Sequence, residues 1–321
     1  MCAEKSRFRP CGLLFSLLKI AAVVSASASA SLGDALQFLN ATGFEGGSTI
    51  DPRFTITSEY GMPKLPGIPC LMNAVNAMQD LALEDFEEPL VPETYFLHDF
   101  PEVMIAPEAP VLGGAIQTRY IIWGLWMGVL AMIEQRMFQT VVFTLNYDRH
   151  VVGSLRIARP EAHSPMEGTS GNSDNMTAVQ RLAIREHVLE LPHNVTQEYN
   201  DGQLAVSFRP IGPPLVDNDV ILAVLYGLVY TAYFKSTQEV NSIDLSLPSP
   251  SKMQIQASAA TPDTSPADVP KLEYRWIIKS LGQIPQYMVQ RKSFSGVTWR
   301  TVIDGKLIGT GQLVKKSDPE D

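Results

Sequence analysis

The sequence predicts an α+β fold in which two similar β-α-β units carry long apolar helices on a mostly antiparallel sheet, followed by a C-terminal hairpin. Three observations lead to this prediction. Residues 120–133 and 220–234 are long apolar stretches, and each is followed by a run rich in β-branched and aromatic residues, as strands prefer. Each stretch also follows a proline-containing connection. Finally, Asp304-Gly305 is a strong signal for a tight hairpin turn.

Residues 1–30 have the features of a secretory signal peptide. A basic start is followed by the largely apolar residues 13–24 and by small residues that offer cleavage after Ala28 or Ala30. We therefore expect a secreted, extracellular protein. Lys19 interrupts the apolar region, and a retained signal anchor is the alternative.

The charge of the mature chain limits its partners. The whole chain has a formal net charge of −9 from 25 basic and 34 acidic residues. The leader holds four of the basic residues and one of the acidic ones, so the mature chain keeps 21 and 33, a balance of −12. Such an acidic surface argues against nucleic acid or an anionic membrane as a partner.

Cysteine usage excludes a scaffold held by disulfides. Cys2 and Cys11 lie in the leader, so Cys70 is the single cysteine of the mature chain and no intrachain disulfide is possible. Cys70 lies in an apolar-periodic segment, and we expect it to be a buried, small hydrophobic residue rather than a reactive thiol. The mature chain, with about 290 residues, is long enough to build its own hydrophobic core.

Three N-glycosylation sequons agree with an extracellular location. Each lies in a polar, turn-rich stretch where an attached glycan would be tolerated. The predicted glycosylation sites are Asn40, Asn175 and Asn194.

Composition divides the mature chain into four further segments. The segments are an irregular N-terminal arm (31–65), an α+β core of two related units (66–258), a mobile linker rich in Ala, Pro, Ser and Thr (259–270), and C-terminal strands with a hairpin (271–321). We expect the C-terminal strands to pack on the core.

The first helix is predicted over residues 70–83, after Pro69, by an apolar stripe with a period of 3.6 residues. Its far end and exit carry Asp80, Glu84, Asp85, Glu87 and Glu88. Acidic clusters can bind calcium, but the alternating spacing of a calcium loop is missing, so we expect a solvated face. A short strand follows over residues 102–106.

The second helix, residues 120–133, has 14 apolar residues, fewer than the roughly 20 that a bilayer requires. We therefore expect a buried helix and no membrane span in the mature chain. Gly124 and Gly128 form a GxxxG pattern, which in this setting predicts close approach of another element. Strands are predicted over residues 138–147 and 151–157.

The pattern then recurs as a strand (204–211), a helix (220–234) and a strand (240–247). Gly227 stands 103 residues after Gly124. This spacing predicts an internal repeat in which the helix of residues 120–133 corresponds to that of residues 220–234.

Two further signals lie near the C-terminus. Residues 302–309 resemble residues 146–153, each with a strand, a turn that contains aspartate, and a second strand. Residues 271–280 alternate Leu272, Tyr274, Trp276 and Ile278, which predicts a half-buried strand.

No catalytic, cofactor-binding or metal-ligating residue can be assigned from motifs. The sequence lacks the GxSxG elbow, the HExxH pair and the complete glycine-rich loop of a dinucleotide site. The best polar groups are His98-Asp99 and Asp148-Arg149-His150. Neighbours on a strand point to opposite faces and turn residues usually face solvent, so neither group favours a catalytic dyad.

One resemblance rests on residues 70–75 (CLMNAV), 119–125 (RYIIWGL), 138–145 and 151–153 (VVG). Over about residues 65–160, and more weakly over 200–250, the chain resembles uncharacterised secreted proteins of filamentous fungi. That group has no established activity. The resemblance therefore implies secretion and a shared fold, and its motif residues are mainly apolar or small.

Two functions remain open at this stage, with a third class beside them. The first is a secreted, non-enzymatic protein that binds an unknown protein or carbohydrate at a host or cell-wall surface. The alternative is a secreted carbohydrate-active hydrolase whose carboxylate pair the sequence does not locate. A third, a membrane-anchored protein, requires that residues 13–24 be retained. No cofactor is expected in any of them.

Overall fold

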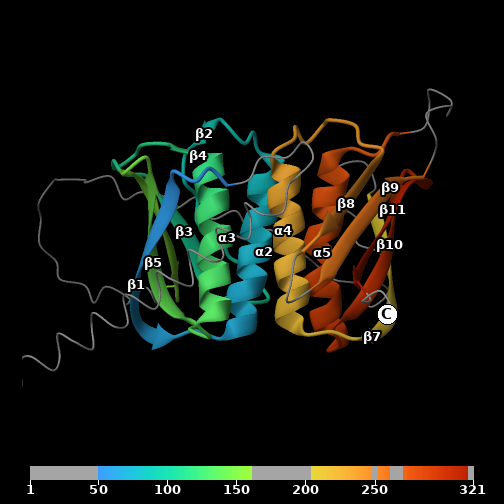
Figure 1. Ribbon diagram of the computed structural model, residues 1–321, viewed down its shortest axis with the longest axis horizontal. Helices are drawn as coiled ribbons and strands as arrows, with labels where there is room; N and C mark the ends of the chain where they lie inside the picture. Colours follow the sequence, from blue (N-terminus) through green and yellow to red (C-terminus); the bar gives the residue numbers. More distant parts are fainter. Residues whose placement is uncertain (1–49, 161–203, 248–251, 261–269, 317–321) are drawn as a thin grey trace, which may run out of the picture. The chain divides into compact units, whose positions relative to one another are not determined.

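The computed structural model describes residues 50–160, 204–247, 252–260 and 270–316. The described residues from Asp51 onward belong to one compact unit. Within it, helices pack on antiparallel sheets, so the predicted α+β class is confirmed (Figure 1). The leader, the three sequons and most of the predicted linker lie outside the described residues.

The first half of this unit, residues 54–158, is called the N-terminal lobe. Its strands are β1 (Phe54–Lys64), β3 (Met104–Glu108), β5 (Gln139–Tyr147) and β6 (His150–Ala158), which form a sheet in the order β1-β5-β6-β3. Two helices, α2 (Gly67–Leu83) and α3 (Thr118–Glu134), pack on this sheet. The short strands β2 (Pro89–Leu90) and β4 (Ile116–Gln117) pair with each other.

The second half, residues 205–315, is called the C-terminal lobe. Its strands are β7 (Ala205–Pro214), β8 (Ser242–Ser246), β9 (Met253–Ala259), β10 (Ser295–Ile303) and β11 (Lys306–Lys315), in the order β7-β10-β11-β9-β8. Helices α4 (Asp217–Ala232) and α5 (Tyr274–Arg291) pack on this second sheet. The strands thus form two principal sheets rather than one.

The two lobes share one topology, but their correspondence differs from the one the sequence predicts. The common order is strand, helix, strand, helix, hairpin, and β1-β5-β6-β3 matches β7-β10-β11-β9. Helix α2 therefore corresponds to α4, and α3 to α5. The predicted match of Gly124 with Gly227 is wrong. The resemblance of residues 302–309 to 146–153 does align the two hairpins, so the C-terminal hairpin belongs to the second repeat.

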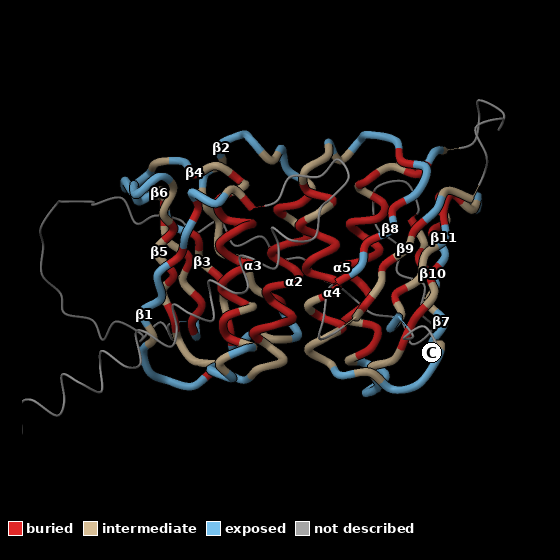
Figure 2. The backbone as a smooth tube through the Cα atoms, viewed as in Figure 1, coloured by how far each residue is buried: buried red, intermediate tan, exposed pale blue. Residues whose placement is uncertain are grey.

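The four helices lie next to one another in the order α3, α2, α4, α5, with the sheets outside them (Figure 1). Most residues of these helices are buried (Figure 2). Trp123 in α3 donates its indole N–H to the hydroxyl of Tyr233 after α4 at 2.9 Å, and the Trp126 and Tyr226 rings have centroids 5.9 Å apart. The lobes therefore share one helical core.

Helix α3 is buried along nearly its whole length, as predicted. A β-carbon at Gly124 would lie 2.5 Å from Cδ2 of Leu145, and one at Gly128 would lie 2.7 Å from Cε2 of Phe143. The GxxxG pattern thus lets strand β5 approach the helix closely. None of the helices in the described ranges is long and apolar enough to cross a membrane.

The predicted strand at residues 271–280 is wrong, because Tyr274 begins helix α5. The alternation of buried and exposed residues that a strand would show is absent at Ile277, which is buried like both of its neighbours. The next buried apolar residues, Leu281, Ile284 and Met288, follow at helical spacing. Tertiary burial on several sides therefore overrides the strand-like composition.

The N-terminal arm is not irregular up to residue 65, because β1 occupies residues 54–64. Only Phe54 and Ile56 of this strand are buried, which explains why the sequence shows no sustained alternation there. β9 also extends to Ala259, so the linker region begins one residue later than predicted.

Candidate functional site

The polar groups found by sequence motifs do not form a site. His98 and Asp99 are both exposed in a loop, and Asp148, Arg149 and His150 are exposed at the turn between β5 and β6. His163, His187 and His193 lie outside the described residues. No group of three or more His, Cys, Asp or Glu side chains that could hold a metal ion occurs within the described ranges.

Cys70 is buried in α2, with 2% of its surface exposed. Burial raises the pKa of its thiol to about 12, because the thiolate would lose its hydration. Since the thiolate is the reactive form, Cys70 is a core residue rather than a nucleophile.

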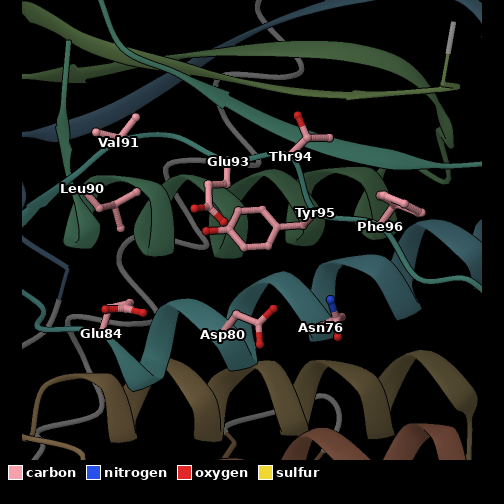
Figure 3. A pocket seen from close by; sticks show the side chains of 9 residues that line it. All are labelled: Asn76, Asp80, Glu84, Leu90, Val91, Glu93, Thr94, Tyr95 and Phe96. Atoms are coloured by element: carbon pink, nitrogen blue, oxygen red, sulfur yellow. The ribbon is translucent and has the colours of Figure 1, made fainter. Parts of the chain in front are cut away.

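The strongest candidate site is a pocket of about 350 Å³ in the N-terminal lobe (Figure 3). It lies between α2 and the segment of residues 90–96, which follows β2. Its lining combines charged, amide, aromatic and aliphatic side chains: Asn76, Asp80, Glu84, Leu90, Val91, Glu93, Thr94, Tyr95 and Phe96. A volume of this size lies within the range of sites for small molecules, about 300–1,000 Å³.

One wall of the pocket is a stripe on helix α2. Asn76, Asp80 and Glu84 follow each other at intervals of four residues, which places them on one face of the helix and its exit. Two of the acidic residues that the sequence predicts to be a solvated face therefore line a pocket. Glu87, from the same acidic stretch, instead forms an ion pair with Arg119 at 2.7 Å.

The other wall is the segment of residues 90–96, and backbone pairing holds it at both ends. Leu90 pairs with Ile116 in the two-stranded sheet. Tyr95 exchanges two backbone hydrogen bonds with Ile105 of β3, at 2.8 and 2.9 Å. From this segment, the side chains of Glu93 and Tyr95 project toward α2 (Figure 3). This wall is therefore pre-formed, as ligand sites usually are.

Asn73, one turn before Asn76, fixes the chain beyond the pocket to helix α2. Its Oδ1 accepts a hydrogen bond from the backbone N–H of Leu97 at 2.6 Å. Its Nδ2 donates to the carbonyl oxygens of Phe100 and Pro69 at 3.0 and 2.9 Å. Asn73 is fully buried, and its bonds explain why a polar residue stands in the apolar stripe of the helix.

Asn76 differs from Asn73 in one respect that points to a ligand. Its side chain is also buried, with 8% exposure, and it is directed toward the pocket (Figure 3). Yet, among the residues that the structure describes, none forms a hydrogen bond with its amide. The amide atoms are not among the fully enclosed side-chain atoms of the described residues that lack a partner, so the amide faces the space of the pocket and is available to a molecule there.

The pocket is strongly acidic. Among the described residues that line it are the carboxylates of Asp80 and Glu84 on one wall and of Glu93 on the other.

Comparisons with known proteins do not identify this chain. No protein-family model matches the sequence, and no curated protein matches it. Among solved structures, a conserved hot dog-fold protein of unknown function from Alicyclobacillus acidocaldarius is 14% identical, covers 89% of this chain and 99% of its own, and has a TM-score of 0.13. A putative thioesterase II from Thermobifida fusca is 9% identical, covers 82% and 92%, and has a TM-score of 0.12.

A putative thioesterase from Novosphingobium aromaticivorans is 11% identical, covers 86% of this chain and all of its own, and also has a TM-score of 0.12. Scores this low do not indicate a shared fold, so these proteins do not bear on the function.

Proposed function

We propose that this chain is a secreted, glycosylated, non-enzymatic binding protein and that the pocket between α2 and residues 90–96 is its binding site. The observation that carries the proposal is the pocket itself, whose wall of residues 90–96 is held by backbone pairing at both ends and whose opposite wall presents the amide of Asn76. This amide makes no hydrogen bond to another described residue, so both its donor and its acceptor can serve a molecule in the pocket.

The leader, the sequons at Asn40, Asn175 and Asn194, and the resemblance to secreted fungal proteins support an extracellular setting for this binding. In that setting the partner is a host or cell-wall component that presents a small polar group to the pocket.

A ligand screen by saturation-transfer NMR on the full-length secreted protein tests the proposal. The probes are neutral oligosaccharides (cellobiose and chitobiose), small amines and small carboxylates. Glu93→Trp places an indole in the pocket, and Leu112→Trp adds the same group at a residue that is 89% exposed. We expect at least one probe class to bind the parent and Leu112→Trp but not Glu93→Trp. No binding by any class, or binding that Glu93→Trp leaves unchanged, would contradict the proposal.

The alternative function, carbohydrate hydrolysis, is supported by a different feature of the same pocket. Carboxylates stand on both walls, Asp80 and Glu84 on α2 and Glu93 on the opposite segment. Glycosidases use two carboxyl groups that flank the scissile bond. If the secreted protein released the aglycone from aryl glycosides, and Glu93→Gln abolished that release, the hydrolase would replace the binding protein.

A further inference from the structure

We propose that the C-terminal sheet binds an acidic polysaccharide, one whose sugars carry carboxylate or sulfate groups, on the face turned away from α4 and α5 (Figure 1). This outer face belongs to the C-terminal lobe, so the inference is separate from the pocket of the N-terminal lobe.

The two lobes do not share the negative charge of the chain. Residues 51–160 contain 13 acidic and 7 basic residues, whereas the described residues between 204 and 316 contain 6 acidic and 12 basic ones. The balances are therefore −6 and +6. Because salt screens exposed charges beyond about 8–10 Å, a ligand at the C-terminal sheet responds to the positive lobe rather than to the net charge of the whole chain.

One row of polar side chains crosses all five strands on the outer face. The strand register lines up Arg209 of β7, Thr298 of β10, Gln312 of β11, Gln256 of β9 and Asp244 of β8. The residues that alternate with this row are buried on the opposite face of the sheet: Trp299, Leu313, Ile255 and Leu245. With strands about 4.8 Å apart, the row is about 19 Å long, which suits an extended oligosaccharide better than a single sugar.

Arg209 and Arg300 supply the positive charge of the outer face. They lie on the paired strands β7 and β10 as diagonal neighbours, about 7–8 Å apart, and both are exposed. Neither forms an ion pair with a described residue. A guanidinium group binds carboxylate or sulfate oxygens through two parallel N–H groups, and an anion beside this pair also reduces the repulsion between the two arginines.

A hydrogen-bond network orients the side-chain amides along the row. Nε2 of Gln254 and Nε2 of Gln256 donate to the two carboxylate oxygens of Asp244 at 2.8 and 3.0 Å, and Nε2 of Gln312 donates to Oε1 of Gln256. The carboxylate of Asp244 is thus engaged within the face. Each amide uses one of its two N–H groups in this network, so its second N–H can donate to a sugar hydroxyl.

The composition of the face favours a polysaccharide over a nucleic acid. Single-stranded nucleic acids are bound by aromatic side chains that stack on the bases. The aromatic residues of β7 and β10 face the core instead, because Trp299 is buried and Phe208 stacks on Tyr287 of α5 at 5.1 Å. Amides and hydroxyls, which match the hydroxyl groups of sugars, occupy the outer face.

The N-terminal lobe shows that the fold does not require an arginine at this place. The two hairpins align Val142 with Thr298, and these residues pair with Glu59 of β1 and Arg209 of β7, respectively. Glu59 therefore corresponds to Arg209, and both are exposed. The same edge strand carries a carboxylate in one lobe and a guanidinium in the other.

Isothermal titration calorimetry on the full-length secreted protein tests this inference with four probes: tetragalacturonic acid, a κ-carrageenan tetrasaccharide, neutral cellotetraose and an oligothymidylate. Arg209→Gln and Arg300→Gln each remove one charge from the outer face. Arg149→Gln removes the same charge from the exposed hairpin turn of the N-terminal lobe, and Glu93→Trp alters the pocket. We expect an acidic oligosaccharide to bind the parent, Arg149→Gln and Glu93→Trp alike, and to bind each outer-face variant at least about tenfold more weakly.

Tighter binding of tetragalacturonic acid assigns the outer face to carboxylated sugars, and tighter binding of the carrageenan fragment assigns it to sulfated ones. Binding of neither, equal binding of cellotetraose, or tighter binding of oligothymidylate overturns the inference. Equal weakening by Arg149→Gln and the outer-face variants shows a general effect of charge and also overturns it. Loss of binding in Glu93→Trp alone moves the acidic sugar to the pocket, which overturns this inference and supports the proposed function.

Discussion

The side chain of Asn73 and the backbone of Leu97 are joined by a 2.6 Å hydrogen bond that connects helix α2 to the chain just beyond the pocket wall. The two residues are 24 positions apart in the sequence, and both are buried. This bond helps to set how residues 90–96 lie over the helix face that carries Asn76 and Asp80.

Asn73→Ala is therefore expected to destabilise the protein. It removes three hydrogen bonds and leaves the N–H of Leu97 and the carbonyl of Phe100 without their partner. We expect a loss of about 2–4 kcal/mol in the free energy of unfolding. Denaturant melts measure it, with Asn146→Ala as the control, because Asn146 makes one longer bond, 3.3 Å to the carbonyl of Thr144. Equal losses in both variants would show that Asn73 does not anchor the segment.

Gly128 is expected to tolerate no side chain, because a β-carbon there would meet the ring of Phe143 at 2.7–3.0 Å. Gly128→Ala should lower the free energy of unfolding by about 1–3 kcal/mol through overpacking, although alanine is the better helix former. Gly67→Ala, whose β-carbon would meet Phe138 at an ordinary 3.5 Å, serves as the control and should be neutral or slightly stabilising. If Gly128→Ala melts like the parent, the close packing of α3 on β5 is wrong.

The thiol of Cys70 is expected to react slowly while the protein is folded. Its pKa is raised from the usual 9.0 to about 12 by burial, so almost no thiolate is present at pH 8. Iodoacetamide labelling of the peptide that contains Cys70, followed by mass spectrometry, should accelerate strongly in denaturant. Fast labelling of the native protein would place Cys70 at the surface.

The raised pKa of Cys70 also affects how the free energy of unfolding depends on pH. A thiol with a higher pKa in the folded than in the unfolded state contributes fully below about pH 9, and this contribution decreases as the pH rises from 9 toward 12. Cys70→Ala should therefore be less sensitive than the parent to alkaline pH in this window.

Part of this architecture could be predicted from the sequence, and the rest could not for physical reasons. The helix around Gly124 and Gly128 and the hairpin at residues 302–309 follow from local patterns that tertiary contacts reinforce. Helix α5 could not be predicted from the sequence. It is buried on several sides, so its apolar residues do not form a single helical stripe, and Tyr274, Trp276 and Ile278 also fit the alternation of a strand. The two lobes cannot be aligned by the lengths of their apolar helices. Their correspondence is set by the position of each helix in the strand order, which the sequence does not show.

The pocket was not predicted, because its second wall depends on contacts between distant residues. One local signal was present: Asn73 and Asn76 interrupt an apolar helix stripe that continues into Asp80 and Glu84. Sequence alone cannot distinguish an asparagine that anchors a loop from one that faces a pocket. Asn73 bonds to the backbone of Leu97, 24 residues away, whereas Asn76 lines the pocket, and only the folded chain shows this difference.

Secretion and glycosylation can both be tested on protein recovered from the culture medium. If the leader is cleaved, protein recovered from the medium should begin near Ser29 or Ser31. It should also lose mass on enzymatic deglycosylation at one or more of Asn40, Asn175 and Asn194. N-terminal sequencing and intact mass determine both points, with Asn→Gln variants of the sequons as controls. An intact N-terminus on cell-associated protein would support the anchored form instead.

The most direct test of the binding site is Asn76→Leu, measured for stability and binding on the same sample. Leucine has a similar size, and the change removes no hydrogen bond to a described residue, so the free energy of unfolding should change little. Binding of whichever probe the parent takes in the NMR screen should weaken by about tenfold or more. A variant that binds like the parent, or one that loses stability as Asn73→Ala is expected to, would show that Asn76 does not serve a ligand.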